Sequence, residues 1–139
     1  MSQLTIEQYF GKWLTHPDAN AAVKNNADLL IEKVNVLIQH VTKDDVIFPI
    51  NPHTGSIVSG ETFGGFRPQS CAIGAPKSAH KGGEAVDIYD PHNEIDGWLL
   101  RYSMILPQFG LYFEHPSATP RWSHWGIRRP GSGNRFFYP

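Results

Sequence analysis

The sequence predicts a small α+β domain in which a small antiparallel sheet packs against two main helices. Two segments carry apolar residues at helical spacing, and several short segments alternate apolar and polar residues as strands do. Eleven prolines and thirteen glycines among 139 residues indicate many loops and argue against a helical bundle. With 40% hydrophobic residues, the chain is expected to form one domain with one core over residues 1–139.

The first main helix is predicted within "PDANAAVKNNADLLIEKVNVLIQHV", residues 17–41, with Asp18 as its N-cap. Its apolar residues recur at helical intervals and should form the face that covers the sheet: Val23, Ala27, Leu30, Val34, Leu37, Ile38 and Val41. Residues 1–17 are expected to form an N-terminal extension before this helix.

The segment after the first helix is predicted to be irregular. "DDVIFPINPHTGSIVSG", residues 44–60, is β-rich, but Pro49 and Pro52 interrupt it, which is typical of an edge strand or an irregular approach. Residues 60–81 are rich in Gly, Pro and Ser, so they should be mostly loop.

A strand and a second helix are predicted next. "EAVDIY", residues 84–89, alternates as a strand that places Ala85 and Asp87 on one face. "HNEIDGWLLRYSMIL", residues 92–106, is predicted to be a helix with Asn93 as its cap. The inner side of this helix is expected to carry Ile95, Trp98, Leu99 and Tyr102.

Two further strands are predicted in "GLYFE", residues 110–114, and "RWSHWGIR", residues 121–128, joined by the loop "HPSATP". The C-terminal tail, residues 126–139, is turn-rich and ends in aromatic residues that we expect to pack on the body.

Composition and charge exclude several classes of function. A net charge of -1 provides no basic field for nucleic acid. No window is long enough to span a bilayer and the first residues do not form a signal peptide, so we expect a soluble product of the cytoplasm without membrane insertion. Action outside the cytoplasm would require delivery by another protein. The single cysteine, Cys71, excludes an intramolecular disulfide.

The segment "SAHKGGEAVD", residues 78–87, presents an imidazole and a carboxylate that suit a metal. Zinc in hydrolases usually takes three protein ligands from His and carboxylates and leaves a further position for water. His80 would lie in a loop that the two glycines allow to bend, and Asp87 on the following strand. The small Ala85, on the same face as Asp87, would leave space beside the metal.

The third ligand must come from a distant part of the chain, and His124 in "RWSHW" is the candidate. The residues alone leave other interpretations open. His80 could be a solvent-exposed loop histidine, and His124 could pack among aromatics on the sheet. Asp87 could be a turn carboxylate before the next helix, although Asp90 fits that position better.

The segment "SAHKGGEAVD", residues 78–87, resembles a known motif. It matches, position for position, the Ser-x-His-x-x-Gly-x-Ala-x-Asp signature of the zinc D-Ala-D-Ala carboxypeptidase and dipeptidase family. "GGFRP", residues 64–68, and "WSHW" resemble flanking elements of this family, and the likeness runs from about residue 27 to the end. The chain most resembles small phage and bacterial members that cut peptidoglycan stem peptides. The resemblance implies a hedgehog/D-Ala-D-Ala peptidase-like fold with Zn²⁺ held on the sheet by His80, Asp87 and His124.

The resemblance also implies a carboxylate that takes a proton from the metal-bound water. The family commonly places it three residues before the third ligand, but Arg121 occupies that position and cannot deprotonate. Glu114 is the nearest candidate, and a hairpin would bring it beside His124; otherwise it is a strand-end carboxylate in solvent. Glu84 is a weaker candidate because it points to the other face, and His115 is a candidate oxyanion donor or supporting group.

By resemblance, Arg67 grips a substrate carboxylate or the tetrahedral oxyanion. The alternative is a loop arginine without a fixed partner, because an apparent insert at 61–64 disturbs the family spacing. Ser78 is expected to hydrogen-bond loop backbone or a ligand rather than act as a nucleophile. Trp122 and Trp125 are expected in the core and the cleft wall.

These patterns favour a zinc metallopeptidase that hydrolyses an amide bond in peptidoglycan stem or crosslinking peptides. A phage lysis enzyme or a virion-associated protein acting at the cell wall or periplasm would fit the expected lack of a signal peptide. The alternative is a non-catalytic, metal-containing structural or wall- or tail-binding module, favoured by Arg121 at the usual base position. A metal hydrolase of esters or phosphates is a weaker third option, since no phosphate-binding glycine loop is present. The sequence specifies neither the scissile bond nor an oligomeric state.

Overall fold

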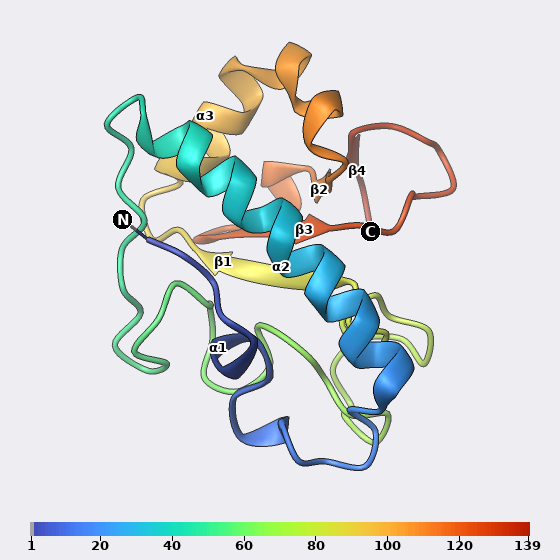
Figure 1. The fold of residues 1–139 in the computed structure, drawn as a ribbon. Helices are drawn as coiled ribbons and strands as arrows, with labels where there is room; N and C mark the ends of the chain where they lie inside the picture. Colours follow the sequence, from blue (N-terminus) through green and yellow to red (C-terminus); the bar gives the residue numbers. More distant parts are fainter. Residues whose placement is uncertain (1) are drawn as a thin grey trace.

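Four short strands form one mixed sheet with the order β1-β3-β2-β4, and the long helix α2 lies across it (Figure 1). The computed structural model describes residues 2–139. The helices are α1 (Ile6–Phe10), α2 (Ala21–Thr42) and α3 (Glu94–Arg101), and the strands are β1 (Ala85–Tyr89), β2 (Tyr112–Glu114), β3 (Trp122–Gly126) and β4 (Phe136–Phe137). Short 3-10 helices span Gly11–Trp13, Ser103–Phe109 and Pro116–Ala118. The α+β class predicted from the sequence is confirmed.

The sheet is mixed rather than antiparallel, because the C-terminal tail contributes a strand. β1 pairs with β3 and β2 pairs with β3 in antiparallel directions, whereas β4 pairs with β2 in parallel. β3 ends with Gly126 opposite Tyr112, where β2 begins. A chain that crosses β2 at that point and then continues along its outer edge must run in the same direction as β2.

Helix α2 begins two residues later than expected for a cap at Asp18, because Asn20 is the cap. The Asn20 side chain accepts a hydrogen bond from the backbone N–H of Val23 at 3.0 Å. The carboxylate of Asp18 instead accepts the backbone N–H of Gln69 at 2.9 Å and fastens the long loop. The apolar face predicted for this helix is confirmed, since all seven of its residues are buried in the core.

The N-terminal segment is part of the core rather than an appendage. Leu4, Tyr9 and Phe10 are buried in the same hydrophobic cluster as the sheet and α2. The Tyr9 hydroxyl donates a hydrogen bond to the carbonyl oxygen of Ala85 at 2.9 Å, which joins α1 to strand β1. The predicted extension over residues 1–17 therefore has to be corrected for the part that the structure describes, residues 2–17.

Asn93 occupies the N-cap position of α3, as predicted, but the side chain that accepts the N–H groups of the first turn is that of Asp90. The Asp90 carboxylate accepts the backbone N–H groups of Ile95 at 3.0 Å and Asp96 at 2.9 Å. Asn93 is left-handed, with φ of 57°, and its side chain accepts the N–H of Arg121 instead.

The second helix also ends earlier than predicted. The α-helix ends at Arg101, and a 3-10 helix that contains Pro107 follows. Tyr102, expected on the inner side, is 39% exposed, whereas the other three predicted inner residues of this helix are buried.

The segment between α2 and β1 is irregular. For residues 44–60 the sequence left open an edge strand or an irregular approach, and the structure shows the irregular form. Within it, Val58 forms an isolated bridge with Ile88 of β1, and Asn51 bridges Ser56. Residues 60–81 form turns and bends. Among the described residues, no helix has the length and apolar character needed to cross a bilayer.

The buried carboxyl group of Asp96, where α3 meets β3, makes the stability of the fold depend on pH. Burial raises the pKa of Asp96 to about 6; hydrogen bonds from Ser123 and Thr119 lower it and the charge of Asp90 raises it. Between pH ~4 and ~6 the Asp96 carboxyl keeps its proton in the folded protein but loses it in the unfolded chain. The stability that this group contributes is therefore fully present below pH ~4 and is lost as the pH rises through about 6. The loss amounts to roughly 3 kcal/mol.

We therefore expect Asp96→Asn to be more stable, relative to the native protein, at pH 7.5 than at pH 4.5. The neutral amide keeps an acceptor for Thr119, which donates to Asp96 at 3.1 Å, and has no charge to bury. Urea denaturation of both proteins at the two pH values measures the difference. A difference that stays constant with pH would contradict this account of Asp96.

Candidate metal centre

Three donor side chains converge on one point: His80, Asp87 and His124. Asp87 Oδ1 lies 3.0 Å from Nδ1 of His124 and 3.3 Å from Nε2 of His80. One donor atom from each residue falls within 4.8 Å of the others, so the group could hold a metal ion. Zinc–ligand distances of about 2.0–2.2 Å at tetrahedral angles place donors about 3.3 Å apart, which is close to the two distances measured from Asp87.

The pairing of β1 with β3 places two of these residues together. Asp87 lies directly opposite His124 in the antiparallel register. Side chains of directly opposite residues share one face of a sheet, so the carboxylate and the imidazole meet although 37 positions separate them. Both histidines are buried.

The loop before β1 orients the third donor. Nδ1 of His80 lies 2.8 Å from the carbonyl oxygen of Gly65, which assigns the proton to Nδ1 and leaves Nε2 facing Asp87. Such a carbonyl partner is the usual support of a metal-binding histidine. The turn after His80 uses Gly83 at φ of 75°, where a Cβ atom would come within 2.5 Å of the carbonyl oxygen of Val23.

Interactions within the cluster shift the pKa values of Asp87 and His124. Burial raises the pKa of Asp87, but the charge of His80 and the hydrogen bonds from both histidines outweigh it and hold the pKa below its usual range. Burial lowers the pKa of His124, but the hydrogen bond to Asp87 and the charge of Asp87 raise it by more. The pKa of His124 is therefore higher than its ordinary value. A metal ion bound here would replace a proton held between the imidazole and the carboxylate.

Arg67 holds the other oxygen of the same carboxylate. Its Nη2 lies 3.3 Å from Oδ2 of Asp87, and its Nε donates to the carbonyl oxygen of Phe63 at 2.8 Å. Arg67 therefore has fixed partners, unlike a free loop arginine, and it lines the same pocket as the cluster.

Glu114, at the end of β2, is the carboxylate beside the cluster. Its Oε1 lies 4.0 Å from Nδ1 of His124, because β2 and β3 pair as the predicted hairpin. Arg121 is exposed and left-handed, with φ of 76°, and does not line the pocket.

Glu84 and His115, the two other candidate groups from the sequence, interact with residues outside the donor cluster. Glu84 pairs with Arg128 at 2.6 Å. Nδ1 of His115 lies 2.9 Å from the Ser117 hydroxyl, and the His115 ring stacks on Tyr138 at a centroid distance of 4.8 Å. Neither Glu84 nor His115 lines the pocket.

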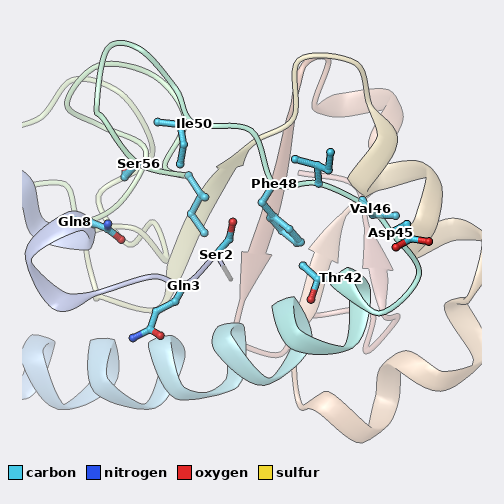
Figure 2. A pocket seen from close by; sticks show the side chains of 11 residues that line it. Ser2, Gln3, Gln8, Thr42, Asp45, Val46, Phe48, Ile50 and Ser56 are labelled. Atoms are coloured by element: carbon cyan, nitrogen blue, oxygen red, sulfur yellow. The ribbon is translucent and has the colours of Figure 1, made fainter.

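The cluster opens into a pocket of about 390 Å³, which we call the metal-centre pocket. Its lining includes Arg67, Ser78, His80, Asp87, Glu114, Trp122, His124, Gly126, Arg128 and Phe137. A larger pocket of about 750 Å³ lies between the N-terminal segment and residues 45–57, and Figure 2 shows it. Among residues 2–139, Asp45 is the only residue with an ionisable side chain that lines this larger pocket, whereas the metal-centre pocket contains the donor cluster.

Sequence reasoning missed Arg128 and Phe137 as lining residues. Strand alternation could have identified Arg128, since residues 122, 124, 126 and 128 share one face with His124. Trp122 lines the pocket and Trp125 is buried in the core, as the sequence predicted for this pair. No local pattern could have identified Phe137, because it arrives on the added strand β4.

No family model matches the chain, and neither a curated protein nor a solved structure matches it. The function has to be inferred from the geometry of the cluster and from the resemblance of its motif.

We expect zinc ions to raise the thermal unfolding midpoint of the native protein by several degrees, because an ion that binds only the folded state stabilises it. His124→Ala should abolish this shift, since it removes one of the three donors. His115→Ala is the matched control and should keep the shift, because His115 lies outside the cluster. Equal shifts in the two variants would contradict the ligand assignment.

Proposed function

We propose that the protein is a zinc-dependent peptidase that hydrolyses an amide bond in peptidoglycan stem or crosslinking peptides. The observation that carries this proposal is that three side chains able to hold a metal ion line the same pocket as a further carboxylate, Glu114. A hedgehog/D-Ala-D-Ala peptidase-like arrangement is consistent with a sheet that bears its donors on two neighbouring strands.

The donor set favours zinc. Two imidazole nitrogens and one carboxylate oxygen are the ligands that catalytic zinc sites use, with a further position left for water or substrate. When bound, the ion would polarise the amide carbonyl and lower the pKa of a water molecule toward neutrality.

Glu114 would act as the proton carrier. Its carboxylate lies beside His124 and lines the same pocket as the cluster. It would accept a proton from the attacking water and pass it to the leaving amine nitrogen. A carboxylate in this position performs the role for which Arg121 is unsuited, which supports the peptidase over the non-catalytic module.

Arg67 would position the substrate. Two of its nitrogens are held by Asp87 and Phe63, while Nη1 has no hydrogen-bond partner among residues 2–139. A guanidinium fixed in this way can donate to a substrate carboxylate or to the oxyanion that develops during hydrolysis without first losing conformational freedom.

The choice of peptidoglycan as the substrate follows from the motif resemblance. The same resemblance supports a phage lysis enzyme or a virion-associated protein that acts at the cell wall or periplasm. The second candidate remains a structural or wall- or tail-binding module with a metal, which is favoured by Arg121 at the position where the family commonly places its base.

Digestion of purified peptidoglycan distinguishes these two candidates. We expect zinc-loaded native protein to release peptide fragments that mass spectrometry identifies, and a chelator to prevent this. Glu114→Gln should lower the rate at least a hundredfold, because the amide cannot carry the proton, while zinc content stays unchanged. Glu94→Gln, which alters an exposed carboxylate on α3, is the matched control and should leave the rate unchanged. Identical fragment patterns with and without chelator, and with Glu114→Gln, would rule out the proposed zinc-dependent peptidase activity.

A further inference from the structure

The turn that carries His80, residues 78–83, is held at both of its ends by one side chain, that of Arg128. Nη2 of Arg128 lies 2.6 Å from Oε1 of Glu84, and Nη1 donates a hydrogen bond to the carbonyl oxygen of Lys77. Lys77 directly precedes this turn and Glu84 directly follows it. One guanidinium therefore joins the two ends of the segment, which we call the His80 turn.

The pairing of β1 with β3 determines where Arg128 lies. The backbone N–H of Ile127 donates to the carbonyl oxygen of Glu84 at 2.9 Å, so the contact between the two chain segments continues beyond the strands themselves. Arg128 is the next residue, four positions after His124. The same stretch of chain thus supplies one metal donor and the side chain that fastens the turn bearing another.

The ion pair packs directly against the backbone of the His80 turn. A Cβ atom on Gly82 would lie 2.5 Å from Oε1 of Glu84 and 3.2 Å from Nη2 of Arg128. Glycine at this position leaves room for the two charged groups. The pair is therefore in contact with the turn as well as with the residues that flank it.

The position of the turn matters because it sets the position of a metal donor. Asn26 of α2 donates to the carbonyl oxygen of Gly82 at 3.0 Å, and the Gly65 carbonyl holds the His80 ring at 2.8 Å. These contacts act within the turn, whereas the ion pair acts on its ends. Nε2 of His80 lies 3.3 Å from Oδ1 of Asp87, and metal–ligand distances vary by only about 0.2 Å, so a small displacement of the turn would weaken metal binding.

We propose that Arg128 and Glu84 are positioning residues, whose ion pair fixes the His80 turn and so raises the affinity of the donor cluster for its metal ion. This inference rests on the proposed function in requiring a zinc centre, but it does not depend on the substrate. Charge alone predicts the opposite effect for Arg128, because a guanidinium that lines the same pocket as the cluster repels a divalent cation. The sign of the effect of removing Arg128 therefore distinguishes positioning from simple electrostatics.

The affinity of the metal-free chain for zinc, measured by competition with a chelator of known affinity, tests the proposal. Arg128→Gln should weaken zinc binding about tenfold, a loss typical of residues that orient metal ligands. Arg129→Gln is the matched control, since it removes the same charge from a neighbouring residue that does not line the metal-centre pocket, and zinc affinity should not fall. Arg128→Lys should recover part of the loss, because an ammonium group can keep one of the two partners.

A double-variant cycle tests whether the two residues act together. Arg128→Gln should cost less zinc affinity in a Glu84→Gln background than in the native chain, because the ion pair is already lost there. The thermal unfolding midpoint without metal verifies that each variant folds. It should change little, since the side chains of the pair are 43% and 22% exposed and such pairs contribute little to stability.

If Arg128→Gln does not fold, Arg128→Lys replaces it and should itself bind zinc more weakly than the native chain. Native or tighter zinc binding by the Arg128 variants, or additive losses in the cycle, would overturn the positioning proposal and leave the zinc peptidase standing. Failure of the native chain to bind zinc would overturn both.

Discussion

The pairing of β1 with β3 is the constraint on which the site depends. Because side chains alternate along a strand, a shift of the register by one residue would send Asp87 and His124 to opposite faces of the sheet. The backbone of Asp87 also bonds to Ser59 and Gly64, so this residue connects the sheet, the pocket loop and the donor cluster. A disturbance of β1 would therefore affect all three.

Burying an ionised cluster costs free energy unless its members compensate one another. Here the Asp87 carboxylate divides its oxygens, one facing both histidines and the other facing Arg67. A buried group of this kind contributes little to stability compared with a well-packed apolar core, and removing one partner leaves a charge unpaired. The same arrangement of donors could hold a metal ion.

The small sheet needs support from the rest of the chain, and the N-terminal segment provides much of it. Tyr9 binds the carbonyl of Ala85, and its own carbonyl accepts the N–H of Phe66 at 3.3 Å. A Cβ atom on Gly65 would lie 2.0 Å from that Tyr9 carbonyl, so only glycine permits this approach. The approach presents the Gly65 carbonyl to His80, which links α1 to the orientation of a metal donor.

Local patterns in the sequence determined the elements whose form depends on neighbouring residues: the apolar face of α2, the alternation of β1, and the motif that carries His80 and Asp87. The tertiary structure decided which oxygen caps α3, where Asp90 serves in place of Asn93, and which strand completes the sheet. It also brought Phe137, on the added strand β4, into the lining of the pocket. These features depend on contacts between segments that are brought together only when the chain folds. Spacing along the sequence does not predict such contacts unless the register of the paired strands is known.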